Sequence, residues 1–305
     1  MADFKRFQPA WNFLGIPDHL ATPDKAQAWV LPIPYEATTC YGTGTREGPA
    51  AIIAASRHAE AYDIEFHCEP CLLYGVHTMK PLASLNSSPE DMTHEVEETV
   101  AAILAGSPAP RLLAVLGGEH SISGGVVRGL ARSVAKNKLV AVHIDAHGDL
   151  RDEYDGSRYS HACAARRITD ICPIFQIGVR SFSEAEEQFR KGNKRVTTIF
   201  SDEAMAPKAP FLKKLAAFVK GKTVYFTIDL DGLDPSIMPA VGTPEPGGLS
   251  WERTMEIADV VCRNAACIPV FDVVELAPIP AMHAPDYLTA ILTYKIMSKI
   301  LLLNR

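Results

Sequence analysis

The chain has 305 residues, of which 47% are hydrophobic and 22% charged, and its formal net charge is −6 at pH 7. This composition is typical of a globular protein with a sizeable core, and the acidic balance argues against a general nucleic-acid binder. Residues 1–15 lack the pattern of a secretory signal and the apolar tract 287–303 is too short and too charged to span a bilayer, so we expect a cytoplasmic protein.

Short apolar runs rich in β-branched residues predict strands that are buried on both faces. These runs are residues 28–33, 72–76, 112–116, 139–144, 174–179, 224–228 and 270–274. Helical stretches between them are predicted to begin near Pro49, Ser88, Ser121, Ser183, Pro210, Ser250 and Asp286. Because strands alternate with helices and no linker or repeat interrupts them, we expect one α/β domain over 1–305, with a mainly parallel sheet between helices.

The cysteines are scattered and odd in number, which is typical of buried thiols in a reducing compartment. They are Cys40, Cys68, Cys71, Cys163, Cys172, Cys262 and Cys267. Only Cys68 and Cys71 form a C-x-x-C pair, and it lacks the second half of a zinc site. We therefore expect structural thiols here in preference to a redox or metal site.

Acidic and histidine side chains follow three of the predicted strands. They are His120, Asp145, His147, Asp149, Asp229 and Asp231. In an extended chain, residues two apart point the same way, so each Asp and His group after a strand should face one side. Ligands of α/β proteins gather at the carboxyl ends of parallel strands, where these residues should converge.

Isolated residues of these types are usually helix caps or surface groups, but a gathered set of four carboxylates would be strongly unfavourable without cations. The set is too large for one tetrahedral zinc and suits two cations roughly 3.5–4 Å apart. Mixed oxygen and nitrogen ligands favour Mn²⁺, with Ni²⁺ or Co²⁺ as alternatives. His143 lies within the apolar run, and we expect it to support the ligands by hydrogen bonding and not to bind metal.

Three motifs resemble the metal-binding signatures of the arginase and agmatinase ureohydrolases in sequence, order and spacing. They are Gly-Gly-Glu-His at 117–120, Asp-Ala-His-Gly-Asp at 145–149 and Asp-Leu-Asp-Gly-Leu-Asp-Pro at 229–235. The resemblance runs from about Pro32 through the C-terminal segment. It implies the three-layer α/β/α fold of arginases, a homotrimer or homohexamer, and hydrolysis of a guanidinium group to urea and an amine.

The resemblance also implies a role for each matching residue. One Mn²⁺ would be bound by His120, Asp145, Asp149 and Asp229, and the second by Asp145, His147, Asp229 and Asp231. Asp149 would also orient the attacking water and relay its proton. Glu275 would pair with the substrate guanidinium, Thr243 could hydrogen-bond to it, and His161 would pass a proton to the leaving amine.

Residues 150–160 are expected to select the substrate. Arginases commonly carry an Asn and a Ser-x-Asn-x-His arrangement there, which this chain lacks, so arginine is disfavoured. The segment is more similar to that of bacterial and archaeal agmatinases. Asp152, Glu153 and Asp155 offer negative charge to an ammonium group such as that of agmatine, whose hydrolysis yields putrescine for polyamine biosynthesis.

Other readings of this segment stay open at this point. The acids could pair with Arg151 and Arg158 in solvent. Those arginines could also bind a carboxylate such as that of 4-guanidinobutyrate. Free guanidine is a further candidate substrate. A different class of function is also open, in which the protein binds metal without catalysing a reaction.

Overall fold

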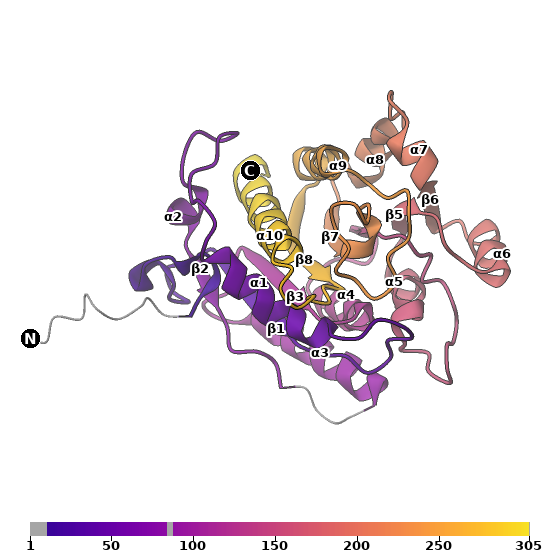
Figure 1. Ribbon diagram of the computed structural model, residues 1–305, viewed down its shortest axis with the longest axis horizontal. Coiled ribbons are helices and arrows are strands. Elements are labelled where there is room, and N and C mark those ends of the chain that lie inside the picture. The colour runs from indigo at the N-terminus through magenta and orange to yellow at the C-terminus, as the bar shows by residue number, and fades with distance from the viewer. Residues whose placement is uncertain (1–10, 84–87, 305) are drawn as a thin grey trace, which may run out of the picture.

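The protein, seen in a computed structural model that describes residues 11–83 and 88–304, is built around one parallel sheet (Figure 1). Its order in the described part is β2-β1-β3-β8-β7-β4-β5-β6, and each neighbouring pair is parallel. The strands are β1 (Ala28–Ile33), β2 (Val76–Thr78), β3 (Leu112–Gly117), β4 (Leu139–Ile144), β5 (Ile174–Val179), β6 (Val196–Phe200), β7 (Thr223–Asp229) and β8 (Cys267–Val274).

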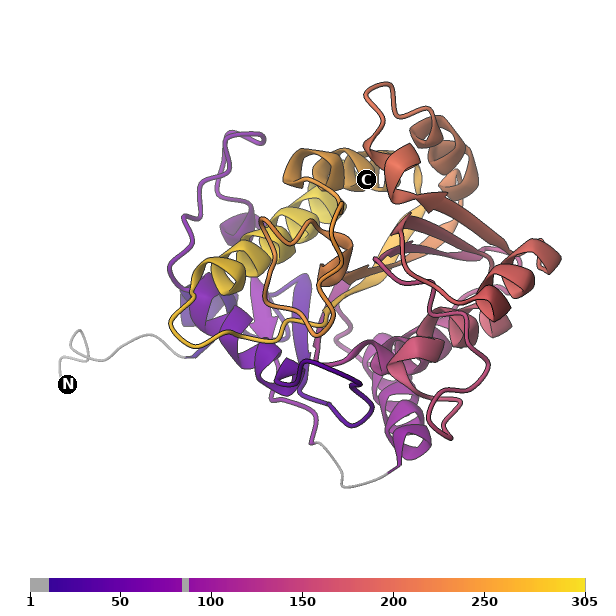
Figure 2. The ribbon, with the colours of Figure 1, turned by 45° about the vertical axis from the view of Figure 1, so that its right-hand side comes forward.

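Helices cover both faces of the sheet, as the turned view in Figure 2 also shows. They are α1 (Gly48–Ser56), α2 (Pro70–Tyr74), α3 (Pro89–Ala105), α4 (Ser123–Ala131), α5 (Ala164–Ile171), α6 (Glu184–Gly192), α7 (Ser201–Met205), α8 (Phe211–Val219), α9 (Trp251–Asn264) and α10 (Ala284–Leu303). Apolar residues of α1, α8, α9 and α10 pack in one core, and those of α3, α4 and α5 pack in the other. The predicted three-layer α/β/α fold is confirmed.

Local sequence explains the best-predicted elements. All residues of β1, β3, β4 and β5 are buried, as apolar runs between two helical layers must be. Helix α3 begins after Ser88, whose side chain accepts a hydrogen bond from the Asp91 N–H in a capping box. The predicted start of this helix is confirmed.

The predicted strand at 72–76 is wrong. Pro70 opens the short helix α2, and Leu72 and Leu73 lie on its exposed side. Gly75 ends the helix with a φ of 63°, a conformation that glycine adopts without strain, and β2 then begins at Val76. An apolar run does not by itself distinguish a short helix from a buried strand, which is why the prediction failed.

The central four strands, β3, β8, β7 and β4, position the site. They are neighbours in the sheet, although β7 and β8 come last in the chain and insert between β3 and β4. Their carboxyl ends therefore bring together segments that lie far apart in the sequence. Gly118 after β3 packs so closely that an added Cβ would collide with the carbonyl oxygen of Tyr35.

Some predictions concern features that the structure does not test. The assignment of 1–305 to one domain stays a prediction, and residues 1–10, which carry most of the segment examined for a signal, lie outside the described residues. Among the helices described, none combines the length and the apolar character that crossing a membrane requires.

Candidate metal centre

The imidazole of His120 is the centre of a first ligand group. Its Nδ1 lies 3.2 Å from Asp145 Oδ2, 3.3 Å from Asp149 Oδ2 and 3.1 Å from Asp229 Oδ2. These side chains come from the ends of three different strands, β3, β4 and β7, and all four are nearly buried. The far nitrogen of the ring, Nε2, lies 3.0 Å from Thr227 Oγ1, so the ring is held with Nδ1 facing the carboxylates.

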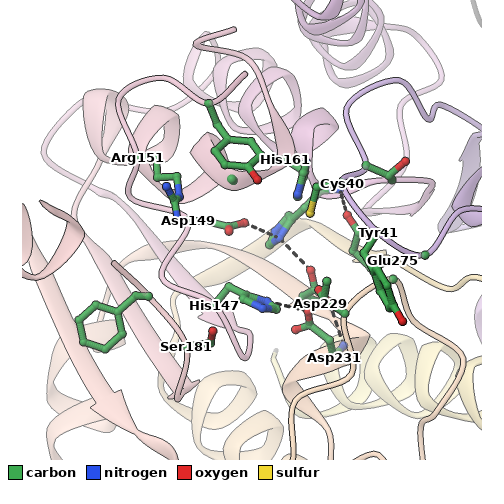
Figure 3. A pocket seen from close by; sticks show the side chains of 18 of the residues that line it. Cys40, Tyr41, His147, Asp149, Arg151, His161, Ser181, Asp229, Asp231 and Glu275 are labelled. Carbon is green, nitrogen blue, oxygen red and sulfur yellow. Dashed lines mark hydrogen bonds and ion pairs between the residues drawn. The ribbon is translucent and has the colours of Figure 1, made fainter. Parts of the chain in front are cut away.

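A second ligand group adjoins the first and shares Asp145 with it. His147 Nδ1 lies 2.8 Å from Asp231 Oδ2 and 3.6 Å from Asp145 Oδ1. Potential ligand atoms of Asp145, His147 and Asp231 all lie within 4.8 Å of one another, as do those of His120, His143, Asp145 and Asp149. Figure 3 shows His147, Asp149, Asp229 and Asp231 pointing toward one another at the floor of a cavity.

Asp229 and His143 lie close to the two ligand groups, but their predicted roles differ from their membership of these groups. Asp229 is in neither of the two sets whose atoms all lie within 4.8 Å of one another, but its Oδ2 contacts His120 and its Oδ1 accepts a 2.9 Å hydrogen bond from the Asp231 N–H. His143 belongs to the first group by distance, with its Nε2 2.8 Å from Asp145 Oδ2 and its Nδ1 3.1 Å from the Gln176 amide. The bridging role of Asp229 and the supporting role of His143 stay predictions.

The pKa values of the cluster reflect crowding of buried acids. Burial, followed by the charges of Asp231 and Asp145, raises the pKa of Asp229 well above its usual value. Burial lowers the pKa of His147, but the carboxylates of Asp145 and Asp231 outweigh it and raise the pKa to about 12. The acids therefore attract positive charge strongly in this site.

Divalent cations fit these residues. Within the described part of the chain, the buried atoms His120 Nδ1 and Asp145 Oδ2 make no well-aligned hydrogen bond, although they lie close together. Buried polar atoms are rarely left without a partner, so these two atoms fit the role of ligands to a cation. Carboxylate and imidazole donors in two adjoining groups suit two borderline cations of the Mn²⁺ type.

The cavity above the cluster has a volume of about 260 Å³, which fits a small molecule. Its lining includes the predicted ligands His120, His147, Asp149, Asp229 and Asp231 and the predicted substrate-contacting residues His161, Thr243 and Glu275. Asp145 lies beneath them, fully buried. The structure thus brings the predicted ligands together with Glu275, Thr243 and His161 around one small cavity, and Figure 3 shows Glu275 and His161 there.

The structure does not bring Asp152 and Glu153 into this cavity. Asp152 Oδ1 instead contacts the guanidinium groups of Arg167 at 2.8 Å and Arg158 at 3.0 Å. Glu153 lines a separate surface depression. Both acids therefore lie outside the lining of the cavity, and this placement gives no support to the prediction that they contact the substrate.

The cavity wall also contains Arg151, which the sequence offered as a binder of a carboxylate, and two residues that the sequence did not single out, Tyr154 and Glu186. Arg151 and Tyr154 come from the segment 150–160, and the Arg151 guanidinium lies 4.9 Å from the centre of the Tyr154 ring. Glu186 lies beside Arg151, at 3.6 Å, and caps α6. Tyr154 and Glu186 come from a loop and a helix end that no local pattern connects to the metal motifs, so only the fold could reveal them.

Comparisons with known proteins agree with this site. Residues 26–303 match the sequence model of the Arginase family. The chain is 37% identical over 273 residues to N(1)-aminopropylagmatine ureohydrolase of Synechocystis sp., covering 88% of this chain and 87% of that protein. It is 30% identical over 285 residues to an agmatinase of Halalkalibacterium halodurans, covering 92% of each.

A solved structure leads to the same family. The crystal structure of agmatine ureohydrolase of Thermoplasma volcanium matches with a TM-score of 0.79 and 31% identity, over 91% of both chains. The chain belongs to the Arginase family and is a ureohydrolase of that family. The family resemblance noted in the sequence is confirmed.

Proposed function

We propose that the protein uses two Mn²⁺ ions to hydrolyse the guanidinium group of agmatine, giving urea and putrescine. The observation that carries this proposal is the juxtaposition of two ligand groups, which share Asp145, with the carboxylate of Glu275 around one cavity. A cation cluster beside a carboxylate suits hydrolysis of a cationic, planar group, because the carboxylate can bind the group while the cations activate water. The cations, when bound, supply Lewis acidity and an activated water.

The residues around the cavity have separate tasks in this proposal. Glu275 is nearly buried and lies on the cavity wall, where one carboxylate can accept two N–H groups of a guanidinium and fix its plane. Thr243 offers a hydroxyl on the same wall. Asp149 and His161 also line the cavity; Asp149 would orient the attacking water and accept its proton, and His161 would pass a proton to the leaving amine.

The cavity mouth supports a linear substrate with a cationic tail. The aromatic side chains of Tyr154 and Phe182 line it, and aromatic faces attract ammonium groups and pack against methylene chains. Arg151 would repel such a tail, but Glu186 at 3.6 Å offsets part of its charge. The compound 4-guanidinobutyrate therefore stays among the substrates to test, because the Arg151 guanidinium would attract its carboxylate.

N(1)-aminopropylagmatine is a second candidate substrate. The relative with 37% identity carries the name of an enzyme acting on it. This compound shares the guanidinium and differs in a longer amine tail, so the same metal cluster and Glu275 would serve it. The two substrates differ only in the amine tail, so the residues at the mouth of the cavity, such as Tyr154 and Phe182, would decide between them.

A urea-release assay on Mn²⁺-loaded protein tests the proposal. The panel is agmatine, N(1)-aminopropylagmatine, 4-guanidinobutyrate, guanidine and arginine. We expect kcat/KM to be highest for agmatine or its aminopropyl derivative and far lower for arginine. Equal values for agmatine and arginine would contradict the substrate assignment, and no urea from any compound would favour the non-catalytic alternative.

Two further expectations remain part of the proposal, the assembly from the family resemblance and the location and partners from the sequence. The protein is expected to form a homotrimer or homohexamer and to work in the cytoplasm without membrane or nucleic-acid partners. Size-exclusion chromatography with light scattering measures the first directly.

A further inference from the structure

The hydroxyl of Thr38 lies between a buried acid and the ring of His161. Thr38 Oγ1 donates a 2.7 Å hydrogen bond to Glu119 Oε1, and it lies 3.1 Å from His161 Nδ1. It also accepts a 2.9 Å hydrogen bond from the backbone N–H of His161. Glu119 comes from the segment after β3, Thr38 from the loop after β1, and His161 from the start of a 3-10 turn before α5.

The Glu119 carboxylate is fixed by its surroundings. It is fully buried, and its Oε2 accepts hydrogen bonds of 2.7 Å from the N–H groups of both Ala37 and Thr38. Its Oε1 accepts from the hydroxyls of Thr38 and Ser121, the latter at 2.6 Å. Four donors fill the accepting capacity of a carboxylate, so Glu119 holds the loop 37–38 and requires Thr38 to donate.

We infer that Glu119 and Thr38 are positioning residues that set the tautomer of His161, with the ring proton on Nδ1. A hydroxyl has one proton and two lone pairs. The proton of Thr38 goes to Glu119, and one lone pair accepts the backbone N–H of His161. The remaining lone pair faces Nδ1, so a bond at 3.1 Å requires Nδ1 to be the donor.

Ser160 does not change this assignment. Its Oγ lies 3.3 Å from His161 Nδ1 and could donate to an unprotonated nitrogen. In that case the lone pair of Nδ1 would face a lone pair of Thr38 at 3.1 Å, which is repulsive. With the proton on Nδ1, both oxygens can accept it.

The consequence for the reaction rests on the proposed function. His161 lines the cavity, whereas Thr38 and Glu119 are not among its lining residues, so the ring nitrogen left for proton transfer there is the unprotonated Nε2. As the C–N bond of the guanidinium breaks, the amine nitrogen needs one proton. The proton that Asp149 accepts from the attacking water reaches Nε2 through solvent and passes from there to that nitrogen, and the ring returns to its Nδ1–H form.

The test is the ¹⁵N spectrum of the histidine rings in the full-length protein kept free of paramagnetic Mn²⁺. The His161 signals are assigned by their loss in His161→Gln. We expect an Nδ1–H ring in the wild type, loss of this single tautomer in Thr38→Val and Thr38→Ala, and recovery in Thr38→Ser. Ser160→Ala is the matched control and should keep the wild-type tautomer.

Kinetics provide the second measurement. For the substrate that the panel identifies, Thr38→Val should lower kcat at least about 10-fold, part of the roughly 10²–10⁴-fold that a positioned proton-transfer group contributes. KM and the content of two metal ions should change little, and Thr38→Ser should recover kcat.

The two measurements separate this inference from the proposed function. An Nε2–H ring in the wild type would overturn the inference that Glu119 and Thr38 set the tautomer, whatever the activity. An Nδ1–H ring that persists in Thr38→Val and Thr38→Ala would overturn it as well. Normal kcat in a Thr38→Val protein with an altered tautomer would overturn its kinetic role. Absence of urea release from every guanidine would count against the proposed function alone, and the spectra would still decide the tautomer.

Discussion

The carboxylate of Glu275 accepts a 2.6 Å hydrogen bond from the backbone N–H of His120, so the proposed substrate-binding acid is joined directly to a proposed metal ligand. Burial, followed by the negative charge of Glu119, raises the pKa of Glu275 well above its usual value. A bound guanidinium would compensate this unfavourable charge. Glu275 also has a φ of 69°, a strained value for a residue with a side chain, which indicates that the fold fixes its position.

The substitution Glu275→Gln should lower kcat/KM at least ~100-fold, equivalent to roughly 2.7 kcal/mol of transition-state stabilisation. Glutamine keeps the shape and can still accept from the His120 N–H, but it loses the charge that grips the guanidinium. Both metal ions should remain bound. Glu153→Gln is the matched control outside the cavity and should leave kcat/KM unchanged. Loss of metal in Glu275→Gln would make Glu275 a ligand or scaffold residue.

Elemental analysis after Mn²⁺ loading tests the shared ligand. Asp145 belongs to both ligand groups, so Asp145→Asn should lose both ions, whereas Asp231→Asn should lose only one. Asp229→Asn separates two outcomes for the second predicted bridge. Loss of both ions is expected if Asp229 bridges, and loss of one would show that it serves a single ion. Retention of two ions by Asp145→Asn would contradict the sharing.

Most of the metal site could be predicted from the sequence because period-two spacing after apolar strands is a local pattern. His120, His147 and the pair formed by Asp145 and Asp149 could be placed on strand ends without knowing the order of strands. Their convergence needed only the rule that parallel strands end at one edge.

The parts that could not be predicted depend on long-range contacts. The contact of Thr38 with Glu119 and His161 joins three segments, and nothing in the sequence near Thr38 signals it. The edge strand β6 was missed because its residues are mostly half-buried and two are threonines, so it lacks the continuous apolar pattern of the central strands. The orientation of Asp152 was likewise set by Arg167, which lies on α5.

The close approach of Gly118 to Tyr35 leads to a prediction about the free energy of unfolding. In Gly118→Ala, the new Cβ would collide with the backbone oxygen of Tyr35 and force apart the segments that carry Tyr35 and Glu119. We expect a loss of about 3 kcal/mol or more in the free energy of unfolding, measured by urea denaturation. In Gly192→Ala, by contrast, the new Cβ meets nothing within 4 Å, and the stability should change little. Equal midpoints for the two variants would show that the loop adapts.

The seven cysteines are free, and their surroundings predict very different reactivity. Thiolate is the reactive form, and burial raises the pKa of Cys163 to about 11 and of Cys172 and Cys262 to about 12. These thiols should resist labelling near pH 8 and react only as the pH rises toward those values. Exposed Cys40, at the cavity mouth, should react first.

A bulky thiol reagent on Cys40 should therefore block the cavity and inactivate the enzyme. Cys40→Ser should be active and resistant to the reagent. Mass spectrometry of the labelled peptides identifies the modified residue. Inactivation of Cys40→Ser at the wild-type rate would place the sensitive thiol elsewhere.

The central claim is that two cations on the shared ligand groups and a guanidinium on Glu275 meet in one cavity. Its most direct test is a titration of metal-free protein with Mn²⁺ while urea release from agmatine and N(1)-aminopropylagmatine is followed. We predict that activity rises with added metal and reaches a plateau at two ions per chain. A plateau at one ion per chain, or no urea at any metal content, would contradict the account.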